Sequence, residues 1–187
     1  MSEIFPKARF ELFEPQPACA PYLEILSQNP RFHFHRTGIG SRVCELFMAT
    51  DPSGVVTGGA HIVLNQTGTS RNLVRIPCCR LDDALDLRPQ QEDRAFLKLD
   101  LQGWELETLK GADGILDRIE VILCEVSFYA QAYEPSIEAL VHFLDERDFS
   151  LYDIAALAAR RRDNRAHQGD FLFARRDSPL MSDTAWG

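Results

Sequence analysis

The chain opens with two short stretches in which apolar and polar residues alternate. Residues 8–13 and residues 31–37 show this period of two, which predicts a β-strand for each. The first stretch ends at Glu14-Pro15, because proline cannot donate to a strand ladder. Between the two strands, residues 17–28 place apolar side chains on one side of a short helix, which ends by Asn29-Pro30. A strand, a helix and a strand are therefore expected at the start.

The next forty residues predict further strands with flexible connections. Alternating apolar runs cover residues 43–48, 60–64 and 73–76. Residues typical of turns separate these runs, at Asp51-Pro52-Ser53-Gly54, Gly58-Gly59 and Thr67-Gly68. We interpret residues 41–80 as a β-rich insertion.

The second half of the chain alternates between strand and helix patterns. Residues 96–101 predict a strand, residues 104–116 a helix, and residues 121–126 a strand that is almost wholly apolar, as strands buried in parallel sheets are. Apolar residues at helical spacing predict a helix over 137–144, with Ser136 at its start. Strands at 150–154 and 170–173 follow, joined by an arginine-rich stretch. The pattern predicts an α/β fold with a mostly parallel sheet and flanking helices, in one domain over residues 1–176 with a tail at 177–187.

Composition narrows the classes of partner. The 187 residues carry a formal net charge of −8, which argues against binding to nucleic acid or to an anionic membrane surface. No apolar run approaches the roughly 18 residues that a membrane span requires, and none near the start is typical of a signal peptide. Five cysteines without a CxxC pair indicate neither a zinc site nor a disulfide framework. We expect a cytoplasmic protein with no metal.

Three acidic residues lie at predicted strand ends, where open parallel sheets bind ligands. Glu14 could accept hydrogen bonds from both hydroxyls of a ribose, or could be an ordinary turn residue. Asp100, or Gln102 beside it, could cap the helix that follows, while Asp100 could alternatively serve as a general base or hold a ligand. Glu125 interrupts an apolar strand and needs a partner. That partner could be Lys98, in a structural ion pair, or a substrate.

Two other groups carry weaker signals. His33 and His35 lie two residues apart on one face of a strand, which suits either a metal or an ordinary sheet surface. The arginines at positions 160, 161, 162 and 165 could bind a phosphate or a carboxylate on a substrate, or could belong to a solvated loop.

Five segments, which together span nearly the whole chain, form a recognisable pattern when they are read in order. They are Phe13-Glu14-Pro15, Leu81-Asp82-Asp83-Ala84-Leu85, residues 96–112 (FLKLDLQGWELETLKGA), Val121 to Phe128 (VILCEVSF), and Gly169-Asp170-Phe171-Leu172-Phe173. This pattern resembles the FkbM family of methyltransferases, and its most specific part is residues 96–112.

The resemblance implies a class I methyltransferase fold, which is Rossmann-like, with S-adenosylmethionine (SAM) as methyl donor and usually an oxygen acceptor. Glu14 would then hold the SAM ribose, and Gly40 and Ser41 would border the adenine. Asp100, Gln102 and Gly103 would line the cleft where the methionine part and the acceptor meet. Asp100 and Glu125 are the expected catalytic residues.

One departure from the family pattern concerns the N-terminus. Family members begin with a strand and a glycine-rich turn that approaches the methionine part of SAM, whereas this chain begins at the segment that follows them. We considered an upstream start codon, a degenerate relative, and a second chain that supplies the missing elements. Because a central gap would leave two unpaired strand edges, we favour the upstream start and expect weak or absent SAM binding by an isolated monomer.

The sequence therefore supports a leading hypothesis and two alternatives. The first is O-methylation of a hydroxyl on a sugar or secondary metabolite, with a small molecule or a glycan as the acceptor. The second is a non-catalytic binding or assembly domain, in which a homodimer closes the gap in the sheet. The third, a nucleotide-dependent oxidoreductase, lacks its GxGxxG fingerprint.

Overall fold

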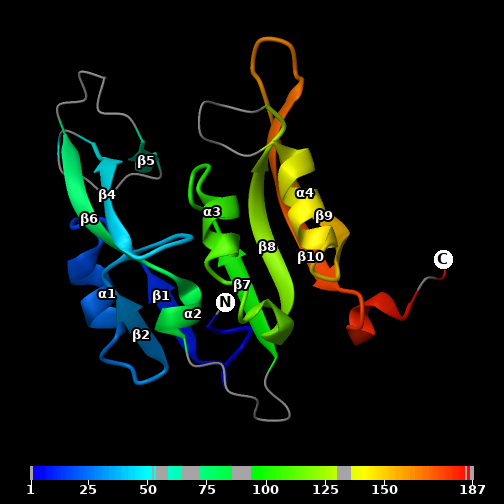
Figure 1. The fold of residues 1–187 in the computed structure, drawn as a ribbon, viewed down its shortest axis with the longest axis horizontal. Coiled ribbons are helices and arrows are strands. Elements are labelled where there is room, and N and C mark those ends of the chain that lie inside the picture. Colours follow the sequence, from blue (N-terminus) through cyan, green and yellow to red (C-terminus); the bar gives the residue numbers. More distant parts are fainter. Residues whose placement is uncertain are drawn as a thin grey trace. The chain divides into compact units, whose positions relative to one another are not determined.

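A computed structural model describes residues 2–51, 53, 59–64, 72–85, 94–129, 136–183 and 185. The chain forms two compact units, Met1–Cys79 and Arg80–Gly187, and we describe each by itself (Figure 1). The single domain over residues 1–176 stays a prediction. The turns expected at Gly54, Gly58 and Thr67-Gly68 lie outside the described residues.

The first unit opens with the strand, helix and strand that the sequence predicts. Strand β1 (Phe10–Phe13) and strand β2 (Phe32–His35) pair in parallel, and helix α1 (Ala20–Leu26) connects them. Aromatic side chains hold this register: the rings of Phe10 and Phe32 stack at 4.8 Å, and those of Phe13 and His35 at 4.4 Å.

A second sheet of the first unit contains β3 (Gly38–Ile39), β4 (Cys44–Ala49), β5 (His61–Val63) and β6 (Leu73–Cys79). Its strand order is β3-β6-β4-β5. β4 pairs antiparallel with β5 and β6, whereas β3 pairs in parallel with β6. The three alternating runs of the predicted β-rich insertion are therefore confirmed as β4, β5 and β6.

The second unit is a four-stranded sheet with helices. In chain order its elements are α2 (Leu81–Ala84), β7 (Ala95–Leu99), α3 (Glu105–Lys110), the 3-10 helix η1 (Leu116–Arg118), β8 (Ile119–Ser127), α4 (Ile137–Asp145), β9 (Phe149–Ala159), β10 (Ala166–Arg175) and the 3-10 helix η2 (Pro179–Met181). The strand order is β7-β8-β10-β9, and α4 packs along β9. Phe149, Phe171, Phe173, Ile122 and Leu144 are fully buried in its core.

The prediction of a mostly parallel sheet needs correction. β7 and β8 are parallel, but β10 runs antiparallel to both of its neighbours, β8 and β9. The fold is α/β with mixed sheets. The physical reason is the short link of residues 160–165 between β9 and β10, since a link of that length can join only antiparallel neighbours. Figure 1 shows this hairpin projecting beyond the other strands of its sheet.

The helix predicted over residues 104–116 is shorter than expected. It ends at Lys110, and Gly111 is its C-cap residue. The following residues form turns before η1, because Gly111 and Gly114 have a low preference for helix. The helix predicted over 137–144 is confirmed as α4, and Ser136 Oγ caps it by accepting the Ala139 N–H at 3.2 Å.

Candidate functional site

The turn between β7 and α3 carries most of the polar groups of the candidate site. Gln102 and Gly103 both have a left-handed backbone, with φ of 53° and 98°. Glycine adopts this conformation without cost, but glutamine does so rarely. The Leu101 N–H donates to Glu105 Oε1 at 2.7 Å, which closes the turn against the start of α3. The backbone and one buried carboxyl thus fix the turn.

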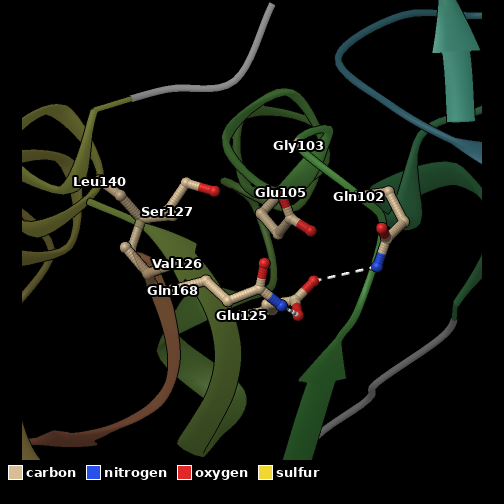
Figure 2. Close-up of a pocket in the computed structure, with 8 residues that line it drawn as sticks. All are labelled: Gln102, Gly103, Glu105, Glu125, Val126, Ser127, Leu140 and Gln168. Carbon is tan, nitrogen blue, oxygen red and sulfur yellow. Dashed lines mark hydrogen bonds between the residues drawn. The ribbon is translucent and has the colours of Figure 1, made fainter. Parts of the chain in front are cut away.

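Gln102 connects the two acids that the sequence singled out as catalytic. Its side-chain Nε2 donates to Asp100 Oδ1 at 3.3 Å and to Glu125 Oε2 at 3.0 Å. The other oxygen of Glu125, Oε1, accepts from Nε2 of Gln168 on β10. Two amides therefore hold the Glu125 carboxylate between β7 and β10 (Figure 2).

Lys98 interacts with Asp100. Its Nζ lies 2.9 Å from Asp100 Oδ2, and both side chains are about half exposed. Lys98 was considered as the structural partner of Glu125. In the structure the side-chain amides of Gln102 and Gln168 take that role. The helix cap also differs from the structural alternative: the N-cap residue of α3 is Trp104, not Asp100 or Gln102.

Glu105 is the most buried acidic side chain of the site, with 2% of its surface exposed. Burial raises the pKa of its carboxyl to about 7, and the nearby charge of Glu125 adds to the rise, whereas backbone N–H donors oppose it. A carboxyl with this pKa exchanges protons near neutral pH, which is the property expected of a general acid or base.

These groups surround a small hollow. Its volume is about 20 Å³, which corresponds to about one water molecule. Figure 2 draws the carboxyl groups of Glu105 and Glu125 among the side chains that line it. The lining residues are Gln102, Gly103, Glu105, Glu125, Val126, Ser127, Leu140 and Gln168.

The residues predicted for the site fall into two groups. Asp100, Gln102, Gly103 and Glu125 come together in the second unit, through the contacts described above. Glu14, Gly40 and Ser41 belong to the first unit.

Within the first unit, Glu14 follows β1, and its Oε1 accepts the Gln16 N–H at 2.8 Å. Burial raises its pKa, and the hydrogen bonds from Gln16 oppose this rise. Gly40 follows β3, and its N–H donates to the Cys79 carbonyl at 2.9 Å.

Sequence reasoning missed two residues of the site, Glu105 and Gln168. Glu105 could have been found from its position at the start of a predicted helix four residues after Leu101, where a carboxyl can accept backbone N–H groups. No local signal marks Gln168. It reaches Glu125 only because β10 pairs with β8, which sets Gln168 opposite Ser127.

The two histidines considered as metal ligands have protein partners. His35 Nε2 lies 2.7 Å from Glu11 Oε2, and His33 Nε2 lies 3.2 Å from the Pro30 carbonyl. Among the residues that the structure describes, no group of three or more His, Cys, Asp or Glu side chains could hold a metal ion. No helix in the same part of the chain is both long enough and apolar enough to cross a membrane.

Comparison with known proteins places the chain in a family. A search of curated proteins gave no match. Among solved structures, methyltransferase FkbM from Methylobacillus flagellatus KT is similar, with 19% identity and a TM-score of 0.49. The match covers 88% of this chain but 36% of that one, so the chain spans about a third of its length. The model of the methyltransferase FkbM domain matches residues 3–151. Because the matched segment is more than half of the 187-residue chain, the chain belongs to the FkbM methyltransferase family.

Proposed function

We propose that the protein transfers a methyl group from SAM to a hydroxyl of a sugar, glycan or other small molecule, and that the hydroxyl enters the hollow beside Glu105 and Glu125. The observation that carries the proposal is the convergence of these two carboxyls, that of Glu105 at the start of α3, the helix that follows β7, and that of Glu125 near the end of β8. In α/β sheets, ligands bind at the carboxyl ends of the strands.

The polar groups around the hollow favour a ligand group that donates a hydrogen bond. Gln102 uses both amide hydrogens, on Asp100 and Glu125, and Gln168 donates one to Glu125, so oxygen acceptors outnumber the remaining N–H donors of these side chains. A hydroxyl donates to such oxygens, whereas a phosphate or carboxylate would be repelled by the two acids. The volume of about 20 Å³ suits a single hydroxyl rather than a whole sugar ring.

The chain retains residues that fit part of the cofactor. Glu14 is partly buried beside a parallel strand pair and accepts one backbone N–H, while a carboxylate has about four acceptor positions. It can therefore also accept hydroxyls of a ribose. We propose that Glu14, Gly40 and Ser41 of the first unit hold the nucleoside part of SAM. The role of Asp100, Gln102 and Gly103 toward its methionine part stays a prediction. When bound, SAM supplies an electrophilic methyl group.

Three carboxyl groups are candidates to accept the proton that the acceptor hydroxyl loses. Asp100 and Glu125 are the predicted ones, and the pKa of about 7 adds Glu105. We propose that Glu125, fixed by two amides, orients the hydroxyl and that Glu105 accepts its proton. The buried position of Glu105 also keeps bulk water from the proton-accepting group.

Two measurements test the proposal. Calorimetric titration of SAM into this chain and into an upstream-extended form measures cofactor binding, and transfer of an isotope-labelled methyl group to a panel of sugars measures activity. We expect Glu125→Gln and Glu105→Gln to lower transfer by about 10²-fold or more, the usual contribution of a positioned acid or base. Glu107→Gln, on the same helix but paired with Lys110, serves as the control. Absence of SAM binding by both forms would overturn the enzyme proposal.

A further inference from the structure

A cluster of cationic and aromatic side chains lies where β8 and β10 meet the β9–β10 hairpin. We call it the Tyr129 cluster: Tyr129, Arg160, Arg165 and His167. The Arg165 guanidinium lies 4.3 Å from the centre of the Tyr129 ring, and that of Arg160 lies 5.3 Å from it. The imidazole ring of His167 also contacts the Tyr129 ring, with 5.9 Å between the two ring centres. The ring of Tyr129 therefore gathers two guanidinium groups and an imidazole.

The two arginines of the cluster differ in charge balance. Arg160 forms a two-pronged pair with Asp163, in which Nε and Nη2 each donate to one carboxylate oxygen. Within the described residues, no carboxylate pairs with the guanidinium of Arg165, whose contact is the Tyr129 ring. Arg165 thus brings an unbalanced positive charge to a chain with a net charge of −8.

Two polar atoms of the cluster are buried without a hydrogen bond. In the part of the chain that the structure describes, neither Tyr129 Oη nor His167 Nδ1 has a partner. Such atoms are rare in folded proteins, because each loses its hydrogen bonds to water without replacement. Oxygen atoms of an anion would accept from the hydroxyl, from a protonated imidazole nitrogen and from the adjacent guanidinium.

The cluster adjoins the residues of the proposed acceptor site along the chain, in both β8 and β10. His167 directly precedes Gln168, which holds Glu125, and Tyr129 lies two residues after Ser127, which lines the hollow. The Phe128 N–H donates to the His167 carbonyl at 2.9 Å, so the pairing of β8 and β10 continues into the cluster. One ligand could therefore present a hydroxyl to the acids and a negatively charged group to the arginine.

We propose that Arg165, Tyr129 and His167 form an anion subsite that binds a phosphate or carboxylate group of the methyl acceptor. This inference rests on the proposed function for the identity of the ligand, but the anion site itself is tested without SAM. The proposed acceptor therefore carries two different groups. Its neutral hydroxyl is methylated, and its negatively charged group holds the molecule in place. The nearby acids repel that charged group and so prevent the molecule from binding in reverse.

Binding of inorganic phosphate to the whole chain, measured by calorimetry, tests the subsite. We expect Arg165→Gln to weaken phosphate binding about tenfold or more, as loss of a charge-assisted hydrogen bond does. Arg161→Gln, an exposed position on the same hairpin with the same change of charge, should weaken it about twofold at most by general electrostatics. Tyr129→Phe keeps the ring that the arginines contact and removes only Oη, and it should weaken binding severalfold without unfolding the chain.

Equal effects of Arg165→Gln and Arg161→Gln, or no phosphate binding by the parent chain, would overturn the subsite. Acetate titrated in parallel distinguishes a carboxylate from a phosphate as the preferred group. Methyl transfer then tests the link to the acceptor: Arg165→Gln should raise KM for a sugar phosphate and leave KM for the matching neutral sugar unchanged. Phosphate binding without any methyl transfer would leave the subsite in place and count against the proposed function alone.

Discussion

The side-chain amide of Gln102 donates to Glu125 Oε2 at 3.0 Å from a backbone position whose φ is 53°. A left-handed conformation costs a non-glycine residue about 1–2 kcal/mol. A glycine would avoid that cost but could not bridge Asp100 and Glu125. Backbone strain at such a position is typical of functional sites, where surrounding contacts maintain it.

The first prediction distinguishes the effect of the Gln102 side-chain amide from the effect of its strained backbone. Gln102→Gly relieves the left-handed strain while removing two hydrogen bonds, so the free energy of unfolding should change by about 1 kcal/mol or less. Methyl transfer should fall about tenfold or more, because Glu125 loses a positioning contact. Asp148→Gly, at φ 64° in a turn outside the site, is the matched backbone control and should retain activity. Full activity of Gln102→Gly would contradict the positioning role.

The second prediction concerns pH and Glu105. The pKa of its carboxyl rises from 4.5 to about 7 in the folded chain, so folding favours the protonated form. This contribution to stability is complete below about pH 4.5 and is lost as the pH rises through about 7. The loss is about 3 kcal/mol.

Urea unfolding across this pH range measures the effect. Glu105→Gln cannot ionise and keeps an oxygen for the Leu101 N–H, so it should remove much of the fall in stability. The same slope in the parent chain and in Glu105→Gln would show that the buried carboxyl is not its source.

Gly169 gives a third prediction, which tests the pairing of β9 with β10. A Cβ at this position would lie 2.7 Å from the Ala156 carbonyl oxygen and 2.8 Å from Leu157 Cδ2. Gly169→Ala should therefore lower the free energy of unfolding by about 1–3 kcal/mol, the usual cost of overpacking. A Cβ at Gly59 would meet nothing within 4 Å, so Gly59→Ala serves as the control. Thermal unfolding of both variants decides whether β9 and β10 approach this closely.

The fourth prediction concerns the apolar wall of the hollow. Leu140 on α4 has no exposed surface and lines the hollow. Leu140→Ala should lower stability by about 2–5 kcal/mol, through lost burial and the cavity that remains. Leu151→Ala, at a position 44% exposed on β9, should cost much less. Equal losses in the free energy of unfolding, measured by chemical denaturation, would contradict the packing of α4 described above.

Much of the local structure could be predicted because short-range chemistry decides it. The alternation of residues 8–13 and 31–37 predicted β1 and β2, and Ser136 before an apolar helical pattern predicted the start of α4. The segment from Phe96 to Ala112 carried the family resemblance that the domain match over residues 3–151 bears out. Each of these signals lies within a few residues, where backbone preference and side-chain spacing act.

The pairing of distant strands could not be predicted in this way. The sequence by itself determined that Asp100 and Glu125 lie at the ends of neighbouring strands. Only the tertiary structure decided that β10 runs antiparallel to β8 and brings Gln168 to Glu125, and that Glu105 is buried beside them. Strand direction and burial depend on contacts between residues far apart in the chain, and no local pattern encodes which polar side chain will meet which.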